Sequence, residues 1–175
     1  MKIFINTAII FSVLLSISTS GFYDLQFESI DGTTINTSSF KGKKVVIAVV
    51  SADQKVARLI EYLDSTQKAN DSVRIIAIPT GDFKSTVNVQ TLKDLRSRLS
   101  IIISKPMKVT KESGVQQHAL FSWLTKSAEN THFNMDVSGE GQLFFISPKG
   151  TLYGVFPTGT PLRIISRAIT QSFTE

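Results

Sequence analysis

The two histidines are the side chains best suited to bind a metal or to transfer protons, because imidazole does both near neutral pH. His118 and His132 are the only histidines in the chain. A metal site built on them would also need carboxylates from distant loops. His118 stands at the expected start of a helix, where a structural hydrogen bond is the usual role, and His132 lies in a polar loop. We therefore expect neither histidine to ligate a metal.

Serine side chains act as nucleophiles when a histidine and a carboxylate lie beside them. Ser51, Ser122 and Asp136 could be combined with a histidine in this way, but no Gly-x-Ser-x-Gly turn surrounds either serine. The segment Gly139-Glu140-Gly141 lacks the Gly-Lys-Ser/Thr ending of a phosphate-binding loop and precedes an expected strand. We interpret it as a turn, and we expect no serine hydrolase and no cofactor.

The chain contains no cysteine, so it has no disulfide, no thiolate metal ligand and no thiol nucleophile. Its formal net charge is +5, but the basic residues are scattered along the chain. Only Lys41, Lys43 and Lys44 are grouped, and no aromatic residues interleave with them to stack on bases. We therefore expect no nucleic-acid partner.

The first twenty residues differ from the rest of the chain. Lys2 precedes the apolar stretch Ile9–Leu15, which gives way to the small polar run Ser16–Ser20. This order is typical of a signal peptide, and the apolar part is shorter than the roughly 20 residues that span a bilayer. We predict a signal peptide at 1–20, one exported domain at 21–175 and no membrane span after cleavage; a retained N-terminal anchor is the alternative.

A strand, a helix and a second strand form the centre of the predicted fold. Val45–Val50 is a continuous apolar run rich in β-branched residues, which indicates a strand buried on both faces. Val73–Ile78 is similar and ends at Pro79. Between them, apolar residues recur at helical spacing, namely at Val56, Leu59, Ile60 and Leu63. The order predicts a βαβ unit with parallel strands.

Further elements surround this unit. An N-terminal hairpin is expected to turn at Asp31-Gly32, and the segment from 126 to 141 is expected to be a long irregular loop. The remaining elements are expected as a helix near 92–99, a short extended piece at 101–103, a helix at 119–126, strands at 143–146 and 151–156, and a helix after Pro161. The aromatic residues are expected mainly in the core, namely Phe121, Trp123, Phe133, Phe144 and Phe145. The sum is an α/β fold with a mixed sheet flanked by helices.

Several segments resemble the glutathione peroxidase family, in the family's own order. The N-terminal ones are Phe22-Tyr23-Asp24, Ile30-Asp31-Gly32 and Phe40-Lys41-Gly42-Lys43. The later ones are His118-Ala119-Leu120-Phe121-Ser122-Trp123-Leu124 and Pro157-Thr158-Gly159-Thr160-Pro161-Leu162. Together they extend over nearly all of residues 21–175. The resemblance implies a thioredoxin-like fold and, in the family, reduction of hydroperoxides with a thiol reductant.

The family's catalytic positions depart from its pattern here. The resemblance places Gln54 where the family has the peroxidatic cysteine or selenocysteine, and a carboxamide cannot attack a peroxide or form a sulfenic acid. The family's Asn-Gln-Phe is replaced by Gly81-Asp82-Phe83, which retains only the phenylalanine. Its Trp-Asn-Phe aligns without a gap with Gly139-Glu140-Gly141, whereas a gap would bring Phe133-Asn134-Met135 there instead. The gapped alignment would keep the asparagine and still lose the indole. On the ungapped alignment, no position of the family's catalytic set is intact, since Gln54, Asp82, Gly139 and Glu140 occupy these positions.

Three functional hypotheses follow. The first is an exported pseudo-peroxidase whose former active-site face, around Gln54, Asp82 and Glu140, binds a protein or a small molecule. The second is a peroxidase of the oxidative-stress response that reduces hydroperoxides by a route without its own thiol. The third is a structural domain. Selenocysteine decoded as Gln54 is disfavoured, because the neighbouring positions have changed as well.

Overall fold

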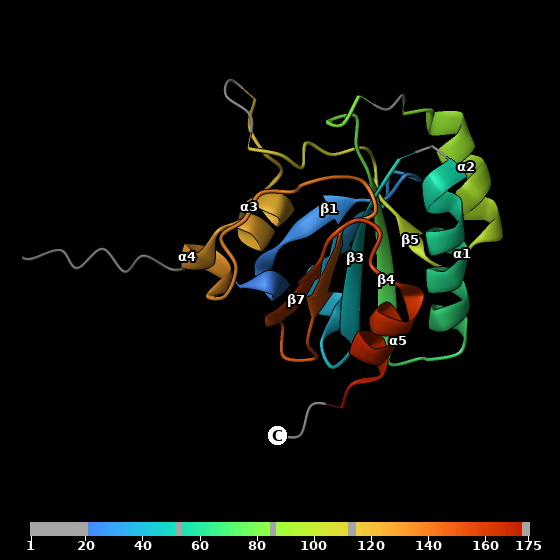
Figure 1. Ribbon diagram of the computed structural model, residues 1–175. Helices are drawn as coiled ribbons and strands as arrows, with labels where there is room; N and C mark the ends of the chain where they lie inside the picture. Colours follow the sequence, from blue (N-terminus) through green and yellow to red (C-terminus); the bar gives the residue numbers. More distant parts are fainter. Residues whose placement is uncertain (1–20, 52–53, 85–86, 112–114, 173–175) are drawn as a thin grey trace, which may run out of the picture.

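The computed structural model describes residues 21–51, 54–84, 87–111 and 115–172, so the predicted signal peptide lies outside the described residues. A five-stranded sheet has the strand order β5-β4-β3-β6-β7, and β1 and β2 form a separate hairpin (Figure 1). The strands are β1 Gln26–Glu28, β2 Thr34–Asn36, β3 Lys44–Val50, β4 Val73–Pro79, β5 Ile102–Ile103, β6 Leu143–Ile146 and β7 Leu152–Phe156. The helices are η1 Phe22–Asp24, η2 Thr37–Phe40, α1 Gln54–Lys68, α2 Val89–Arg98, α3 Ala119–Thr125, α4 Ser127–Asn130 and α5 Leu162–Thr170.

The sheet is mixed, as the sequence predicted. Strands β3, β4 and β5 are parallel to one another, whereas β6 is antiparallel to both β3 and β7. In the central strand, Ile47 pairs with Ile76 on one side and with Phe144 on the other. Strand β4 runs one residue past its predicted end, because Pro79 still pairs with Val50 of β3, and the Thr80 amide donates to the Val50 carbonyl (3.2 Å). A proline lacks only the donor, so it can close a strand in this way.

Two hydrophobic cores lie on opposite faces of the sheet. Alternate residues of β3 enter different cores, because successive side chains of a strand point to opposite faces. Val46 packs in the core that contains the apolar faces of α1, α2 and α5. Val45 packs in the core formed with the hairpin, η1 and α3. Figure 1 shows α1 and α2 on one side of the sheet and α3 and α4 on the other, so the predicted flanking layers are confirmed.

The segment from 126 to 141 is not wholly irregular, which corrects the prediction. It begins with the short helix α4, which the polar sequence did not indicate. Asn130 is buried and holds this segment, because its Nδ2 group donates to the Trp123 carbonyl (2.8 Å) and to the Phe133 carbonyl (2.9 Å). Thr131 caps the C-terminal end of this helix, and its φ of 67° is left-handed. Side-chain hydrogen bonds of Asn130, and not an apolar helix face, therefore stabilise α4.

Gly150 closes the turn between β6 and β7 against Tyr23. Its φ is +84°, and an added Cβ would lie 2.7 Å from Tyr23 Cε2. The tyrosine cannot easily move away, because its hydroxyl donates to the Pro148 carbonyl (2.7 Å). We expect Gly150→Ala to lower the free energy of unfolding by about 2 kcal/mol, through left-handed strain and overpacking together.

Gly32 is the matched control for this substitution. Its φ is +83°, but an added Cβ would meet nothing within 4 Å. Gly32→Ala should therefore cost only the backbone strain, about 1 kcal/mol. Urea unfolding followed by circular dichroism measures both variants. Equal losses for the two variants would show that contact with Tyr23 does not restrict position 150.

Candidate functional site

The positions singled out by the sequence meet at one edge of the sheet, where β3 and β4 end and the chain enters β6. Helix α1 begins at Gln54, shortly after the end of β3. The Thr80 amide donates to the Val50 carbonyl (3.2 Å), which joins the ends of β3 and β4. The Gly141 amide donates to the Val49 carbonyl (2.7 Å). The topology therefore brings the three separate sequence segments to the same edge.

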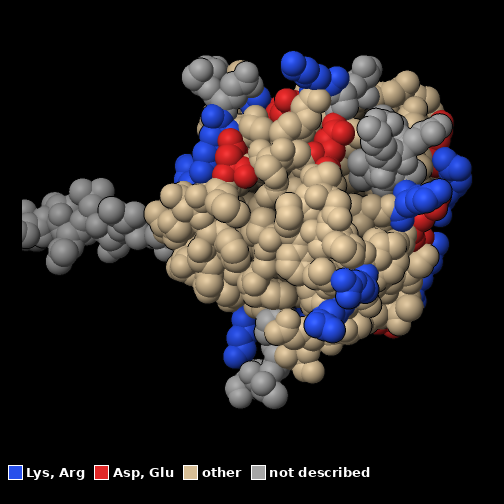
Figure 2. Space-filling view, viewed as in Figure 1, with Lys and Arg blue, Asp and Glu red and all other residues tan. Residues whose placement is uncertain are grey.

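A pocket of about 510 Å³ opens beside this edge, between α1, α5 and the turns that precede β6 and α5. Gly139 and Glu140 line it, together with Phe83 from the segment after β4. Three further apolar side chains line it from the two helices, namely Leu59, Leu162 and Ile165. In Figure 2, the central part of the face shown consists largely of uncharged residues, with Lys, Arg, Asp and Glu gathered toward its edges.

Thr158 fixes the turn that carries Gly139 and Glu140. Its hydroxyl donates to the Glu140 carbonyl (2.5 Å), and an added Cβ at Gly139 would lie 3.2 Å from the same hydroxyl. Gly141 has a φ of +84° and packs against the Thr158 methyl group. The two glycines therefore permit a close approach between this turn and the Pro157–Leu162 segment. The sequence indicated both segments but not their contact.

Glu140 carries the polar atom of greatest interest in the pocket. Its Oε1 atom is buried and accepts no hydrogen bond from any of the described residues. Buried polar atoms in folded proteins nearly always have a partner, so each exception requires an explanation. The backbone carbonyl of the same residue accepts from Thr158, so the unpartnered atom is one oxygen of the side chain.

Asp82 does not line the pocket, although the sequence placed it at the same site. Its Oδ2 atom accepts hydrogen bonds from the Val109 amide (2.8 Å), the Thr110 amide (2.9 Å) and the Thr110 hydroxyl (2.9 Å). Its Oδ1 atom lies 3.2 Å from Lys108 Nζ. Burial opposes the charged form, but these hydrogen bonds outweigh it and hold the pKa of Asp82 below its usual value. Asp82 therefore fastens the segment after β5 to the end of β4.

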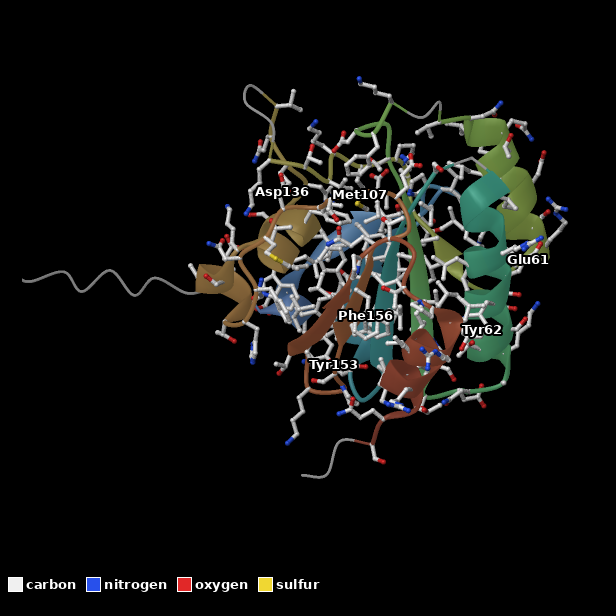
Figure 3. The ribbon with its side chains drawn as sticks, in the orientation of Figure 1. Glu61, Tyr62, Met107, Asp136, Tyr153 and Phe156 are labelled. Carbon is white, nitrogen blue, oxygen red and sulfur yellow. The ribbon has the colours of Figure 1, made fainter. Side chains whose placement is uncertain are left out.

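The residues considered for a triad or a metal site are separated. Asp136 accepts hydrogen bonds from the Lys111 amide (2.9 Å) and the Val137 amide (2.8 Å), far from α1 in Figure 3. His118 caps α3 by accepting from the Leu120 amide at Nδ1 (3.2 Å), and burial lowers the pKa of His118. Within the described ranges, no group of three or more histidine, aspartate and glutamate side chains could hold a metal. The expected structural role of His118 is confirmed.

Ser122 and Phe133, the other residues considered from the sequence, also lie away from the pocket. The Ser122 hydroxyl lies 3.4 Å from Glu129, so it faces a carboxylate without a histidine. Phe133 packs at the border of the core on the hairpin side and does not line the pocket.

The pocket residues on α1 and α5 were not identified as a site from sequence, because their helical spacing indicated only core packing. No helix in the described part of the chain is both long enough and apolar enough to cross a membrane.

Comparison with known proteins supports the architecture. No protein-family model matches the chain, and no curated protein matches it either. Among solved structures, the glutathione peroxidase Trgpx has 18% identity and a TM-score of 0.66, with 86% of this chain and 93% of that chain covered. GPX1 of T. cruzi has 16% identity and a TM-score of 0.65, with coverage of 86% and 94%.

A secreted disulfide oxidoreductase of Mycobacterium tuberculosis is also similar, with 14% identity, a TM-score of 0.56, and coverage of 85% of this chain and 96% of that chain. Identities this low establish the fold and not the activity. The mixed sheet, the N-terminal hairpin and the flanking helices all agree with these neighbours. The chain therefore has the thioredoxin-like fold, in a form similar to that of glutathione peroxidases.

Proposed function

We propose that this chain is an exported, noncatalytic binding domain built on a peroxidase-like scaffold. The observation that carries the proposal is that Gln54 begins α1, directly after the central strand, in a chain without cysteine. A peroxidatic thiol in a thioredoxin-like fold is activated at such a helix start, where the helix dipole favours a thiolate. A carboxamide has no thiolate form and no oxidation ladder, so the first step of thiol peroxidase chemistry is lost.

The surroundings of this position support a binding role. A pocket opens beside α1, with Phe83, Glu140 and the apolar side chains of α1 and α5 around it. Asp82 has become a structural fastening, because its carboxylate is engaged by the Lys108–Thr110 segment. The proposed export rests on the signal-like pattern of residues 1–20. A similar solved structure is that of a secreted protein, which agrees with this proposal.

Peroxide consumption by the purified protein tests the proposal. With hydrogen peroxide and either glutathione or thioredoxin as the reductant, we expect the native chain to match the protein-free background. We expect Gln54→Cys to react: the thiolate attacks one peroxide oxygen, the O–O bond breaks, and a sulfenic acid and hydroxide form. Dimedone labelling measured by mass spectrometry detects the sulfenic acid.

Glu61→Cys is the matched control, because it adds one thiol to an exposed position on the same helix. A helix-start thiol with a pKa one unit lower should react about ten-fold faster near neutral pH. Turnover by the native chain would contradict the noncatalytic proposal and favour a peroxidase without its own thiol. Equal rates for the two cysteine variants would contradict the assignment of Gln54 to the peroxidatic position.

A further inference from the structure

We propose that His118 is a pH-sensitive cap: protonation of its imidazole removes the hydrogen bond at the start of α3 and loosens the first turn of this helix. Such a switch is built into the fold and does not depend on the proposed binding function. Three features support it, namely the ring nitrogen that accepts the hydrogen bond, the side chains that α3 buries and the charges that face the ring.

The cap uses a lone pair of the imidazole ring. Nδ1 of His118 accepts a hydrogen bond from the Leu120 amide (3.2 Å), one of the N–H groups that a helix start leaves without an intrahelical partner. A ring nitrogen accepts only while it is unprotonated, so the neutral ring carries its proton on Nε2. The imidazolium ion has a proton on both nitrogens and can only donate. Protonation therefore turns the acceptor of the Leu120 amide into a second donor.

Helix α3 depends on this end because it is short and its side chains are deeply buried. It has seven residues, too few for a helix to be stable without contacts to the rest of the chain. Leu120, Phe121 and Leu124 are completely buried in the core on the hairpin side of the sheet. The His118 carbonyl also accepts from the Phe121 and Ser122 amides (both 2.9 Å). A movement of His118 therefore disturbs both the first turn and the packing beneath it.

The charges near His118 are already paired with one another. The ring lines a second pocket, of about 350 Å³, with Glu28 of β1 and Lys105 of the segment after β5, and these two side chains form an ion pair. The other described residues that line this pocket are uncharged. The Lys108 carbonyl accepts from the His118 amide (3.0 Å), whereas the Lys108 ammonium group lies 3.2 Å from Asp82. Helix α3 itself contains no charged side chain.

The direction of the pH effect follows from the burial of the ring. Burial disfavours the imidazolium ion and lowers the pKa of His118 in the folded chain. The unfolded chain, with a histidine pKa of about 6.5, therefore binds the proton more tightly. The contribution of the cap to stability is fully present above about pH 6.5. It is lost as the pH falls from there through the lower pKa of the folded state.

Hydrogen exchange of the Leu120 amide at pH 7.5 and pH 5, corrected for the intrinsic pH dependence of exchange, tests the switch. We expect its protection in the native chain to be about five-fold lower at pH 5. His118→Asn retains an acceptor preferred at helix starts and cannot be protonated in this range, so its protection should be equal at the two pH values. His132→Gln alters the other histidine, which is exposed and bonds locally to Thr131, and should retain the native pH effect.

The ¹⁵N chemical shifts of the imidazole rings give a second measurement on the native chain, which requires no variant to fold. At pH 7.5 we expect the His118 proton on Nε2, because Nδ1 accepts the hydrogen bond. A proton on Nδ1 at that pH would overturn the inference. An equal loss of Leu120 protection in the native chain and in His118→Asn would overturn it as well. Neither result depends on peroxide turnover, so failure of the switch and failure of the proposed function are distinguishable.

Discussion

Asp82→Ala is expected to lower the free energy of unfolding by about 3 kcal/mol, because it removes a set of charge-assisted hydrogen bonds in a largely buried place. The Asp82 side chain is 10% exposed and Lys108 is 17% exposed. The substitution leaves the Val109 and Thr110 amides without their acceptor and removes the ion pair with Lys108. Urea unfolding at pH 7 measures the loss.

Asp94→Ala is the control for this substitution. Asp94 lies on the exposed side of α2, where its carboxylate accepts a single side-chain hydrogen bond from Gln90 (3.0 Å). Removing it should change the free energy of unfolding by less than about 0.5 kcal/mol. A loss for Asp82→Ala no larger than this control would show that the segment after β5 is held by other contacts.

The Asp82 carboxylate also makes part of the free energy of unfolding depend on pH. Because the pKa of Asp82 is lower in the folded chain than in the unfolded chain, its contribution is fully present above about pH 4. The contribution declines as the pH falls from there through the lower pKa of the folded state. The difference between native chain and Asp82→Ala should therefore shrink below pH 4, and a difference that stays constant to pH 2 would contradict the assignment.

Phe145→Ala is expected to lower the free energy of unfolding by about 4 kcal/mol, the largest loss among the substitutions considered. Phe145 lies on β6 and is fully buried in the core beneath α5. Its ring centroid lies 4.7 Å from that of Phe156 and 6.0 Å from that of Tyr153. Truncation to alanine removes these contacts and leaves a cavity that neighbouring strands cannot easily fill.

Met135→Ala is the control for Phe145→Ala. Met135 is 58% exposed, so its truncation removes little buried surface and should cost less than about 0.5 kcal/mol. Thermal and urea unfolding of both variants give the comparison. A loss below about 2 kcal/mol for Phe145→Ala would mean that the core around β6 repacks, against the close packing of the structure.

The sequence was most informative where hydrophobic periodicity is strong. Val45–Val50 and Val73–Ile78 are confirmed as neighbouring parallel strands, since long apolar β-branched runs suit few other structures. The spacing of Leu59, Ile60 and Leu63 is likewise confirmed in α1. Helix α4 was missed, because it is a single polar turn whose stability comes from the side chain of Asn130.

The site was less predictable than the fold. Sequence order brought Gly139 and Glu140 to the correct edge of the sheet, because an antiparallel strand beside β3 must begin there. It could not show that Asp82 turns away from the pocket, since its partners at 108–110 lie in a segment without regular periodicity. The partnerless Oε1 of Glu140 depends on three-dimensional packing alone. Such a property has no signature in one sequence.

The alternation of β3 between two cores has a consequence for local opening of the molecule. Ile47 and Ala48 are completely buried, face opposite layers, and are hydrogen-bonded through the backbone to strands on both sides. Loss of one helical layer would therefore leave β3 protected by the other. Amide hydrogens of β3 should exchange with solvent only through global unfolding, whereas those of the terminal helix α5 exchange by a smaller opening.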